Sequence, residues 1–191
     1  MTQEWMTITA TVFRAVDMKE NDRLITLFSH ELGIIKAYLS KVRSKNNPLE
    51  TASNVLVESE WTLTPGREEL YLCREASITT QNLQLRNSYA ALQAACALTK
   101  ITEQSLVQGD PCPEVYELFK LFIKHLPAAK SPATVKAIYQ LKLLAYQGLL
   151  GEDDPEVFVE LSGLRSLEAL LELQLPESAL VAVEDLFLHR F

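Results

Sequence analysis

The sequence predicts an α+β protein of two domains, a small β-barrel over residues 1–80 followed by an all-α helical domain over residues 81–191. Two observations carry this prediction. In the first part, apolar residues recur at every second position in short runs, which is typical of half-buried strands. In the second part, alanine becomes frequent and apolar residues recur at intervals of three and four, which is typical of packed helices.

Five segments of the first part have the strand pattern. In chain order they are residues 6–13, 22–30, 34–41, 55–64 and 68–79. Residues 55–64 alternate most regularly, with Val57, Trp61 and Leu63 on one side. Five short strands separated by turns, within about 80 residues, favour a small closed or partly open barrel such as an OB fold.

The connections between these strands are polar. A charged loop is predicted over residues 14–21, and the Asn-Asn-Pro sequence at 46–48 predicts an irregular, mobile loop after the third strand. Pro65-Gly66 is typical of a type II turn, in which glycine supplies the positive φ.

The second part is divided by helix start and stop signals. An alanine-rich helix around residues 89–107 is ended by Gln-Gly-Asp-Pro, and residues 114–126 have the spacing of an amphipathic helix. Ser131-Pro132 is an N-cap followed by proline at the first helical position. The helix that it opens is apolar around most of its circumference, which predicts a central position. Shorter helices are predicted to begin at Asp154, Ser166 and Pro176.

Composition limits the classes of function. The 191 residues are 48% hydrophobic and 23% charged, as in folded globular proteins. There is no signal-peptide pattern and no apolar run of roughly 20 residues, so we expect a cytoplasmic protein without a membrane partner. The net charge of −7 argues against indiscriminate coating of nucleic acid. Residues 1–86 carry 10 Lys and Arg against 11 Asp and Glu, and residues 87–191 carry 8 against 14, so a DNA-binding surface is expected only in the first half.

No catalytic or metal-binding motif is present. The three cysteines and three histidines are far apart in the sequence, which gives neither a disulfide framework nor zinc-ligand spacing. Phosphate-binding loops, HExxH and GxSxG sequences are absent as well. We therefore expect neither metal nor cofactor, and an enzyme with an unrecognised site is the least favoured function.

The clearest functional signal is a basic segment that ends the third strand. Its members are Lys36, Lys41, Arg43 and Lys45, with no acidic residue between Glu31 and Glu50. Strand parity places Tyr38 beside Lys36, and adds Arg14 and Arg23 as candidates. Cations interleaved with an aromatic side chain suit single-stranded nucleic acid. The alternative is that these lysines only keep a sheet edge soluble.

The helical part has a second signal. Lys120 and Lys124 lie one turn apart at the rim of an apolar stripe, and Lys136 lies on the next helix. An apolar groove edged by lysines would suit an acidic peptide with an apolar end. The alternative is an ordinary solvated helix face.

Several short motifs occur in a fixed order along the chain. They are Lys19-Glu20-Asn21-Asp22, Leu27-Phe28-Ser29, Gly33, Lys41-Val42-Arg43-Ser44-Lys45, Glu69-Leu70-Tyr71-Leu72, Glu75-Ala76, Leu141-Leu143-Leu144 and Gly148. In order and spacing, the chain resembles the bacterial DNA repair protein RecO family. Val42 replaces the glycine usual in the family's basic loop, and residues 50–54 replace a Leu-Gln-Pro-Phe-like segment. Residues 150–163 contain no cysteine, so the chain resembles a short form without the family's zinc module.

The resemblance implies a recombination mediator whose OB fold binds single- and double-stranded DNA. Such proteins join RecR, bind the C-terminal tail of single-stranded-DNA-binding protein (SSB), promote strand annealing, and help load recombinase onto SSB-coated DNA at the nucleoid. They make no covalent bond. Lys41, Arg43 and Lys45 stand at the positions of the family's basic loop, so the resemblance implies that they bind DNA. The alternative function is an adaptor that binds only proteins, with weak or no DNA binding.

Overall fold

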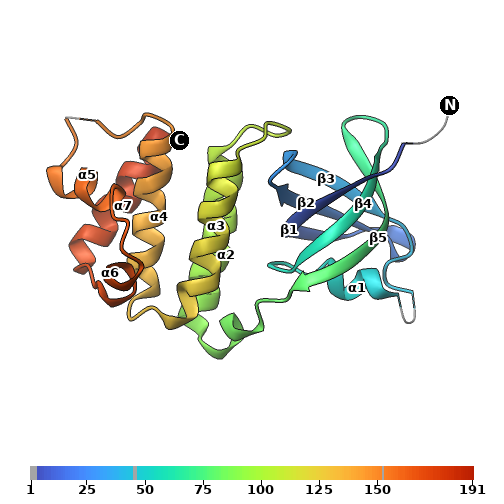
Figure 1. Ribbon diagram of the computed structural model, residues 1–191, viewed down its shortest axis with the longest axis horizontal. Coiled ribbons are helices and arrows are strands. Elements are labelled where there is room, and N and C mark those ends of the chain that lie inside the picture. Colours follow the sequence, from blue (N-terminus) through green and yellow to red (C-terminus); the bar gives the residue numbers. More distant parts are fainter. Residues whose placement is uncertain (1–3, 45–46, 152) are drawn as a thin grey trace. The chain divides into compact units, whose positions relative to one another are not determined.

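The computed structural model describes residues 4–44, 47–151 and 153–191. The chain forms two compact units (Figure 1). The first runs to Asn82 and also includes Leu106–Glu117, and the second consists of Leu83–Ser105 and Leu118–Phe191. The predicted domain division at residues 80 and 81 stays a prediction. The segment 106–117, which that division places in the helical domain, belongs to the first unit.

The first unit is a closed barrel of five strands (Figure 1). The strands are β1 (Met6–Asp17), β2 (Arg23–Ser29), β3 (Gly33–Leu39), β4 (Glu58–Pro65) and β5 (Leu70–Thr80). Their order around the barrel is β1-β2-β3-β5-β4, and every neighbouring pair is antiparallel except β3 and β5. The predicted fold class is therefore confirmed: a five-stranded barrel of the OB type, followed by helices.

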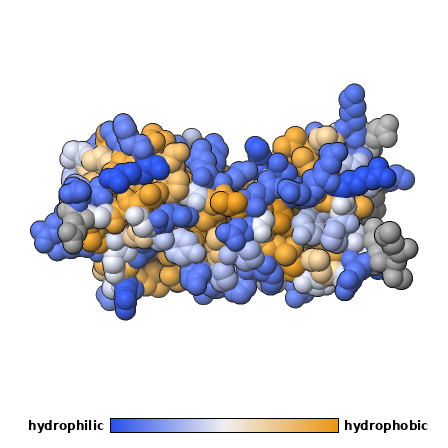
Figure 2. Space-filling model, turned by 90° about the horizontal axis from the view of Figure 1, so that it is seen from above, coloured by the Kyte–Doolittle hydropathy of each residue, from blue (hydrophilic) through white to orange (hydrophobic). Residues whose placement is uncertain are grey.

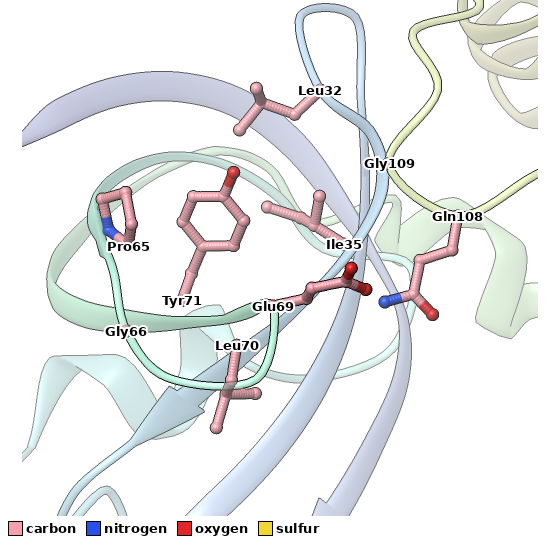
Figure 3. A pocket seen from close by; sticks show the side chains of 9 residues that line it. All are labelled: Leu32, Ile35, Pro65, Gly66, Glu69, Leu70, Tyr71, Gln108 and Gly109. Atoms are coloured by element: carbon pink, nitrogen blue, oxygen red, sulfur yellow. The ribbon is translucent and has the colours of Figure 1, made fainter.

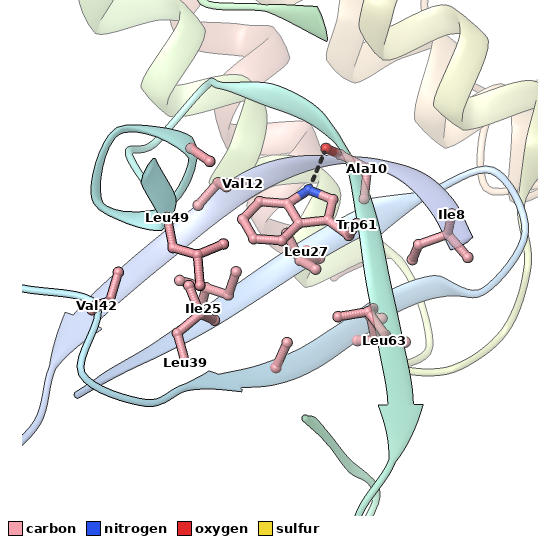
Figure 4. Packing of buried hydrophobic residues seen from close by; sticks show 13 residues of the cluster. Ile8, Ala10, Val12, Ile25, Leu27, Leu39, Val42, Leu49, Trp61 and Leu63 are labelled. Carbon is pink, nitrogen blue, oxygen red and sulfur yellow. Dashed lines mark hydrogen bonds between the residues drawn. The ribbon is translucent and has the colours of Figure 1, made fainter. Parts of the chain in front are cut away.

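One hydrophobic cluster fills the barrel (Figure 4). Its largest member, Trp61, is fully buried, and its indole N–H donates a hydrogen bond to the carbonyl of Ala10 at 3.2 Å. A buried indole N–H without an acceptor would destabilise the fold, so this bond fixes the ring between β1 and β4. Trp61 and Leu63 face the core, as the alternation of residues 55–64 predicted.

Strand β1 is longer than predicted. It continues to Asp17 through a β-bulge between Val12 and Arg14, and only the single turn η1 (Lys19–Asn21) separates it from β2. The predicted loop over residues 14–21 is therefore wrong for its first half. The bulge shifts the alternation of the strand, and this shift turns Arg14 away from the core.

A short helix, α1 (Pro48–Ala52), stands where an irregular loop was predicted. The side-chain oxygen of Asn47 accepts a hydrogen bond from the N–H of Leu49 at 2.9 Å, and Pro48 occupies the first turn. The Asn-Pro pair thus starts a helix. Leu49 and Ala52 of this helix belong to the core cluster of the barrel.

Two other local predictions are wrong. The fourth strand begins at Glu58 and not at Val55, because Leu56 has a left-handed backbone with a φ of 67°. Gly66 does not supply the positive φ of the β4–β5 turn. Glu68 and Glu69 have that conformation instead, with φ of 55° and 59°.

The segment 106–112 lies against β3. Gly33 has a φ of +63°, and a Cβ at this position would lie 2.1 Å from the carbonyl oxygen of Asp110. The segment can approach this closely because residue 33 has no side chain. The N–H of Gly109 donates a hydrogen bond to the carbonyl of Ile34 at 2.8 Å.

Tyr116 attaches the end of the same segment to the barrel. Its hydroxyl donates a hydrogen bond to the carboxylate of Glu58 at 3.0 Å, and its ring packs on Phe28 with the centroids 5.3 Å apart. Burial, together with the nearby Glu58 carboxylate, raises the pKa of Tyr116. The tyrosine is therefore a donor at all physiological pH values.

The second unit is helical. Its elements are η2 (Leu83–Asn87), α2 (Tyr89–Ser105), the end of α3 (Pro113–His125), η3 (Leu126–Ala128), α4 (Pro132–Tyr146), α5 (Glu156–Ser162), α6 (Leu167–Glu172) and α7 (Glu177–Arg190). As predicted, Ser131 caps α4 and Ser166 caps α6 through their side-chain oxygens. Helix α4 is central, as predicted, because it packs against α2, α5 and α7.

Apolar side chains also remain on the surface of the helical unit. Figure 2 shows this as orange areas on the left of the view. The exposed apolar side chains of this unit include Val157 on α5 and Val181 and Leu188 on α7. Within the described ranges, no helix combines the length and the apolar composition that a membrane span requires.

Candidate nucleic-acid interface

One row of side chains crosses the outer face of the barrel. Arg14 on β1 pairs with Thr26 on β2, and Thr26 pairs with Lys36 on β3. Directly opposed residues of paired strands project from the same face. The neighbours Ile25 and Ala37 lie in the core, so this row faces outward. Arg14 and Lys36 are both exposed, and two strand spacings place their Cα atoms about 10 Å apart.

An apolar row lies next to these cations on the same face. It consists of Val16, Leu24, Tyr38 and Leu72, which follow one another across β1, β2, β3 and β5. Val16 and Leu72 are 45% and 36% exposed. Tyr38 is the aromatic member of this row, on which a base could stack while phosphates pair with the cations beside it.

Asp22 fixes the position of Tyr38 and of the basic loop after β3. It accepts a hydrogen bond from the Tyr38 hydroxyl and another, at 2.6 Å, from the backbone N–H of Lys41. Lys41 has a left-handed backbone with a φ of 52°. These two bonds, the one from the Lys41 N–H being the larger effect, lower the pKa of Asp22. A negatively charged Asp22 therefore holds both elements.

Asp17 holds two arginines. Arg23 Nε donates to its carboxylate at 2.7 Å, and Arg43 Nη1 lies 3.6 Å from the other carboxylate oxygen. The Arg23 guanidinium also donates to Ser53 Oγ at 2.8 Å, and its side chain is only 12% exposed. Arg43 donates a further bond to the Met18 carbonyl at 2.8 Å. The hydrogen bond from Arg23 is the main reason that the pKa of Asp17 is lowered.

The structure brings five of the predicted DNA-binding residues to two neighbouring places. Arg14, Lys36 and Tyr38 lie on the outer face of the barrel, where Lys36 and Tyr38 are two positions apart on β3. Lys41 and Arg43 lie in the loop that follows β3, and the Lys41 N–H and Tyr38 hydroxyl share the Asp22 carboxylate. The loop and the face are therefore linked through one acidic residue.

Of the other two predicted residues, Arg23 is not part of this face. Arg23 is directed to Asp17 and to the end of α1, so its guanidinium links elements of the barrel. Lys45 lies outside the described residues.

Sequence reasoning missed the partners of these residues. Val16, Leu24 and Leu72 belong to three different strands, and only the register between strands shows that they flank Tyr38. The hydrogen bond from Lys41 to Asp22 spans 19 residues. The available signal for it was the position of Asp22 directly before a strand, where a carboxylate can cap a neighbouring turn.

In the helical unit, Lys136 is already engaged. Its ammonium group forms an ion pair with Glu184 on α7, and Gln140 donates to the same carboxylate at 3.1 Å. Burial by itself would raise the pKa of Glu184. The hydrogen bonds from Lys136 and Gln140 outweigh this effect, so the pKa is lowered. Lys142 is also used internally, because it donates to the carbonyls of Ser162 and Leu164.

Lys120 and Lys124 lie on α3, where Lys124 is exposed and Lys120 is half-buried. The predicted stripe beside them is largely core, since Phe122 is 1% exposed and its ring packs on Tyr139. Leu121, which lies between the two lysines in sequence, is 45% exposed. The apolar surface next to these lysines is therefore Leu121, and the structure gives no open groove at Phe122.

Two family models match this chain. The model described as "Recombination protein O N terminal" matches residues 1–82, which contain the five strands, and "Recombination protein O C terminal" matches residues 86–150. Residues 151–191, with α5, α6 and α7, lie beyond both matches.

Curated relatives carry the same family name. The chain is 31% identical over 141 residues to the DNA repair protein RecO of Desulfitobacterium hafniense (strain DSM 10664 / DCB-2), a match over 73% of this chain and 50% of the relative. It is 25% identical over 138 residues to that of Acetivibrio thermocellus, over 72% of this chain and 55% of the relative. The chain thus spans about half the length of the curated relatives it matches. Together, the barrel, the matched halves and these relatives show that the chain belongs to the RecO family.

Proposed function

We propose that this chain is a recombination mediator in DNA repair that binds DNA through the outer face of its barrel. The observation that supports this best is the pair of exposed cations, Arg14 and Lys36, beside the apolar row that contains Tyr38. Phosphates would pair with the cations, and unstacked bases would lie on the apolar row. The OB fold commonly uses the face of its second and third strands in this way.

The basic loop would extend this surface. Lys41 and Arg43 follow β3 directly, and Asp22 and Asp17 hold the loop in one conformation. A held loop loses less conformational entropy on binding than a free one. In the proposed complex, Lys41 and Arg43 contact phosphates of single- or double-stranded DNA, and Lys45 continues the same basic sequence.

The names of the relatives support a role in DNA repair, and we extend that role to this chain. In the proposed mechanism the protein makes and breaks no covalent bond. It holds single strands in an extended form, promotes their annealing, and acts with RecR to load recombinase onto SSB-coated DNA in the cytoplasm. Residues 87–191 carry 8 Lys and Arg against 14 Asp and Glu, so the proposed binding surface is confined to the barrel.

The SSB tail is the proposed partner of the helical unit. Lys120 and Lys124 flank the exposed Leu121 on α3, which gives an acidic peptide with an apolar end one apolar and two cationic contacts. Lys136 would take part only after leaving Glu184. The test is the affinity of a labelled acidic peptide that ends in phenylalanine. We expect Lys124→Ala to weaken peptide binding severalfold. The control is Lys100→Ala, which removes an exposed lysine from α2 and should leave peptide binding unchanged.

A second candidate is an adaptor that binds only proteins. The observation in its favour is that Arg23 and Arg43 share the carboxylate of Asp17, which offsets part of their charge. The affinity of this protein for fluorescently labelled single-stranded DNA, measured at low and at moderate salt, distinguishes the two functions. The mediator binds at low salt and releases the strand as salt rises. No binding at low salt would favour the adaptor.

A further inference from the structure

A pocket of about 350 Å³ opens at one end of the barrel (Figure 3). It lies between the β2–β3 turn, the β4–β5 turn and the segment that includes Gln108, all of which belong to the first unit. Ile35 and Tyr71 contribute to its lining from the strands. A volume near the low end of the range for ligand sites suits one large side chain or one base.

The lining combines apolar walls with one carboxylate. Leu32, Ile35 and Pro65 provide apolar contacts, and Figure 3 shows the carboxylate of Glu69 near the side-chain amide of Gln108. Among the described residues that line the pocket, Glu69 is the only charged one. A carboxylate accepts hydrogen bonds and favours positive charge. The pocket therefore suits a group with an apolar stem and a cationic, donor-rich head.

The backbone that carries Glu69 is strained. Glu68 and Glu69 both have left-handed conformations, with φ of 55° and 59°. Each costs a non-glycine residue about 1 kcal/mol or more. The neighbouring hairpin bond, from the N–H of Gly66 to the carbonyl of Leu70 at 2.8 Å, closes this turn. The fold thus maintains an unfavourable turn that places Glu69 at the pocket.

We propose that this pocket binds an arginine side chain presented by a basic segment of a partner protein. The planar guanidinium group can donate two parallel hydrogen bonds to the carboxylate of Glu69. The side-chain carbonyl of Gln108 can accept a third. The aliphatic stem of the arginine packs against Leu32 and Pro65, and the guanidinium plane lies over the ring of Tyr71.

Charge favours a protein over a nucleic acid as the occupant. Glu68 is adjacent to Glu69 and exposed, so two carboxylates stand together where a phosphate of a bound strand would have to approach. Lysine is a weaker fit than arginine, because its single ammonium group cannot form the two-pronged contact. The pocket borders the DNA face, since Leu70 pairs with Lys36. The proposed contact is made by Glu69 and by none of the cations of that face, so the inference does not rest on DNA binding.

The test is an NMR titration of the full chain with N-acetyl-L-arginine amide. We expect saturable shifts of the backbone amide signals of Gly66, Leu70, Tyr71 and Gly109. N-acetyl-L-citrulline amide has nearly the same shape without the charge, and it should cause no such shifts. The corresponding lysine derivative should bind severalfold more weakly.

Two matched variants locate the contact. Glu69→Gln should reduce the affinity for the arginine derivative about tenfold, as expected for a lost charge-assisted hydrogen bond. Glu68→Gln removes the same charge from the neighbouring residue outside the pocket, and it should change the affinity less than about twofold. Both variants should bind labelled single strands no more weakly than the original chain, which separates this test from that of DNA binding.

Three results would overturn the proposal. Equal losses in the two variants would indicate general attraction by surface charge. If guanosine monophosphate bound the pocket more tightly than the arginine derivative in the same titration, the site would be a nucleobase pocket. Equal binding of the citrulline and arginine derivatives to the unaltered chain, or no binding of either, would exclude recognition of the guanidinium group without relying on any variant.

Discussion

The backbone N–H of Lys41 donates a hydrogen bond to the carboxylate of Asp22 across 2.6 Å. This bond joins the β1–β2 connection to the basic loop after β3. Because the same carboxylate accepts the hydroxyl of Tyr38, one acidic residue positions a cation and an aromatic ring of the proposed DNA surface.

Replacing Asp22 with alanine tests this positioning role. The variant loses both hydrogen bonds, and we expect its melting temperature to be lower. DNA affinity should fall although a negative charge is removed, because Lys41 and Tyr38 are no longer held. Thermal unfolding and fluorescence anisotropy measure the two effects. Glu60→Ala, which removes an exposed carboxylate from β4, is the control. Tighter DNA binding by Asp22→Ala would show that only charge matters.

The pH dependence of stability should reflect Asp17 and Asp22. Their folded-state pKa values lie below the ordinary value of 3.8. The folded state then binds fewer protons than the unfolded state near that pH, so the stabilisation is complete above about pH 4 and is lost as the pH falls through the folded pKa values. Melting temperatures between about pH 3 and 6 should decrease less steeply for Asp17→Asn/Asp22→Asn than for the original chain. Parallel curves would contradict this.

Arg23 should contribute mainly to the stability of the fold, and Arg14 mainly to DNA binding. Arg23 is nearly buried and donates to Asp17 and Ser53, so Arg23→Ala should lower the free energy of unfolding by about 1.5–3 kcal/mol. Arg14 is exposed, so Arg14→Ala should change stability by less than about 0.5 kcal/mol and should weaken DNA binding instead. Denaturant unfolding combined with anisotropy checks both variants. A destabilised Arg14→Ala with unchanged DNA affinity would reverse the assignment.

Gly33 and Gly109 form a matched pair for the contact between β3 and residues 106–112. Both have positive φ, but only at Gly33 would an added Cβ meet backbone, at 2.1 Å from the Asp110 oxygen. Gly109→Ala should cost about 1 kcal/mol from the conformation alone. Gly33→Ala should cost at least about 1–2 kcal/mol more, because the segment must move away. Hydrogen exchange of the Gly33 variant should show faster exchange at residue 109. Equal losses in stability would mean that the close approach is not maintained.

The sequence was sufficient to predict the barrel because its alternation is local. Trp61 and Leu63 face the core as their parity requires, and the helix caps Ser131 and Ser166 stand where predicted. The same kind of reasoning failed where one residue changes the alternation. The bulge before Arg14 prolongs β1, and no residue type in this stretch indicates a bulge.

The candidate site was harder to predict because charge has no periodicity. Lys36 and Tyr38 could be placed on one face from strand parity, whereas Arg14 reaches that face only through the bulge. Sequence could not show that Arg23 is directed to Asp17 and Ser53, because these residues meet only when α1 closes on the barrel. For the same reason, Lys136 was predicted as a peptide contact although Glu184, 48 residues later, already binds it.

The salt dependence of single-strand affinity tests the central claim most directly. About four phosphate contacts predict a slope of about −3 for log affinity against log salt concentration. Arg14→Ala/Lys36→Ala/Lys41→Ala removes three of them and should bring the slope to about −1, with weaker binding at low salt. A control variant that removes three exposed cations of the helical unit, Lys100→Ala/Lys124→Ala/Arg165→Ala, should keep the slope near −3. Equal slopes for the barrel variant and the original chain would contradict a DNA-binding face on this barrel.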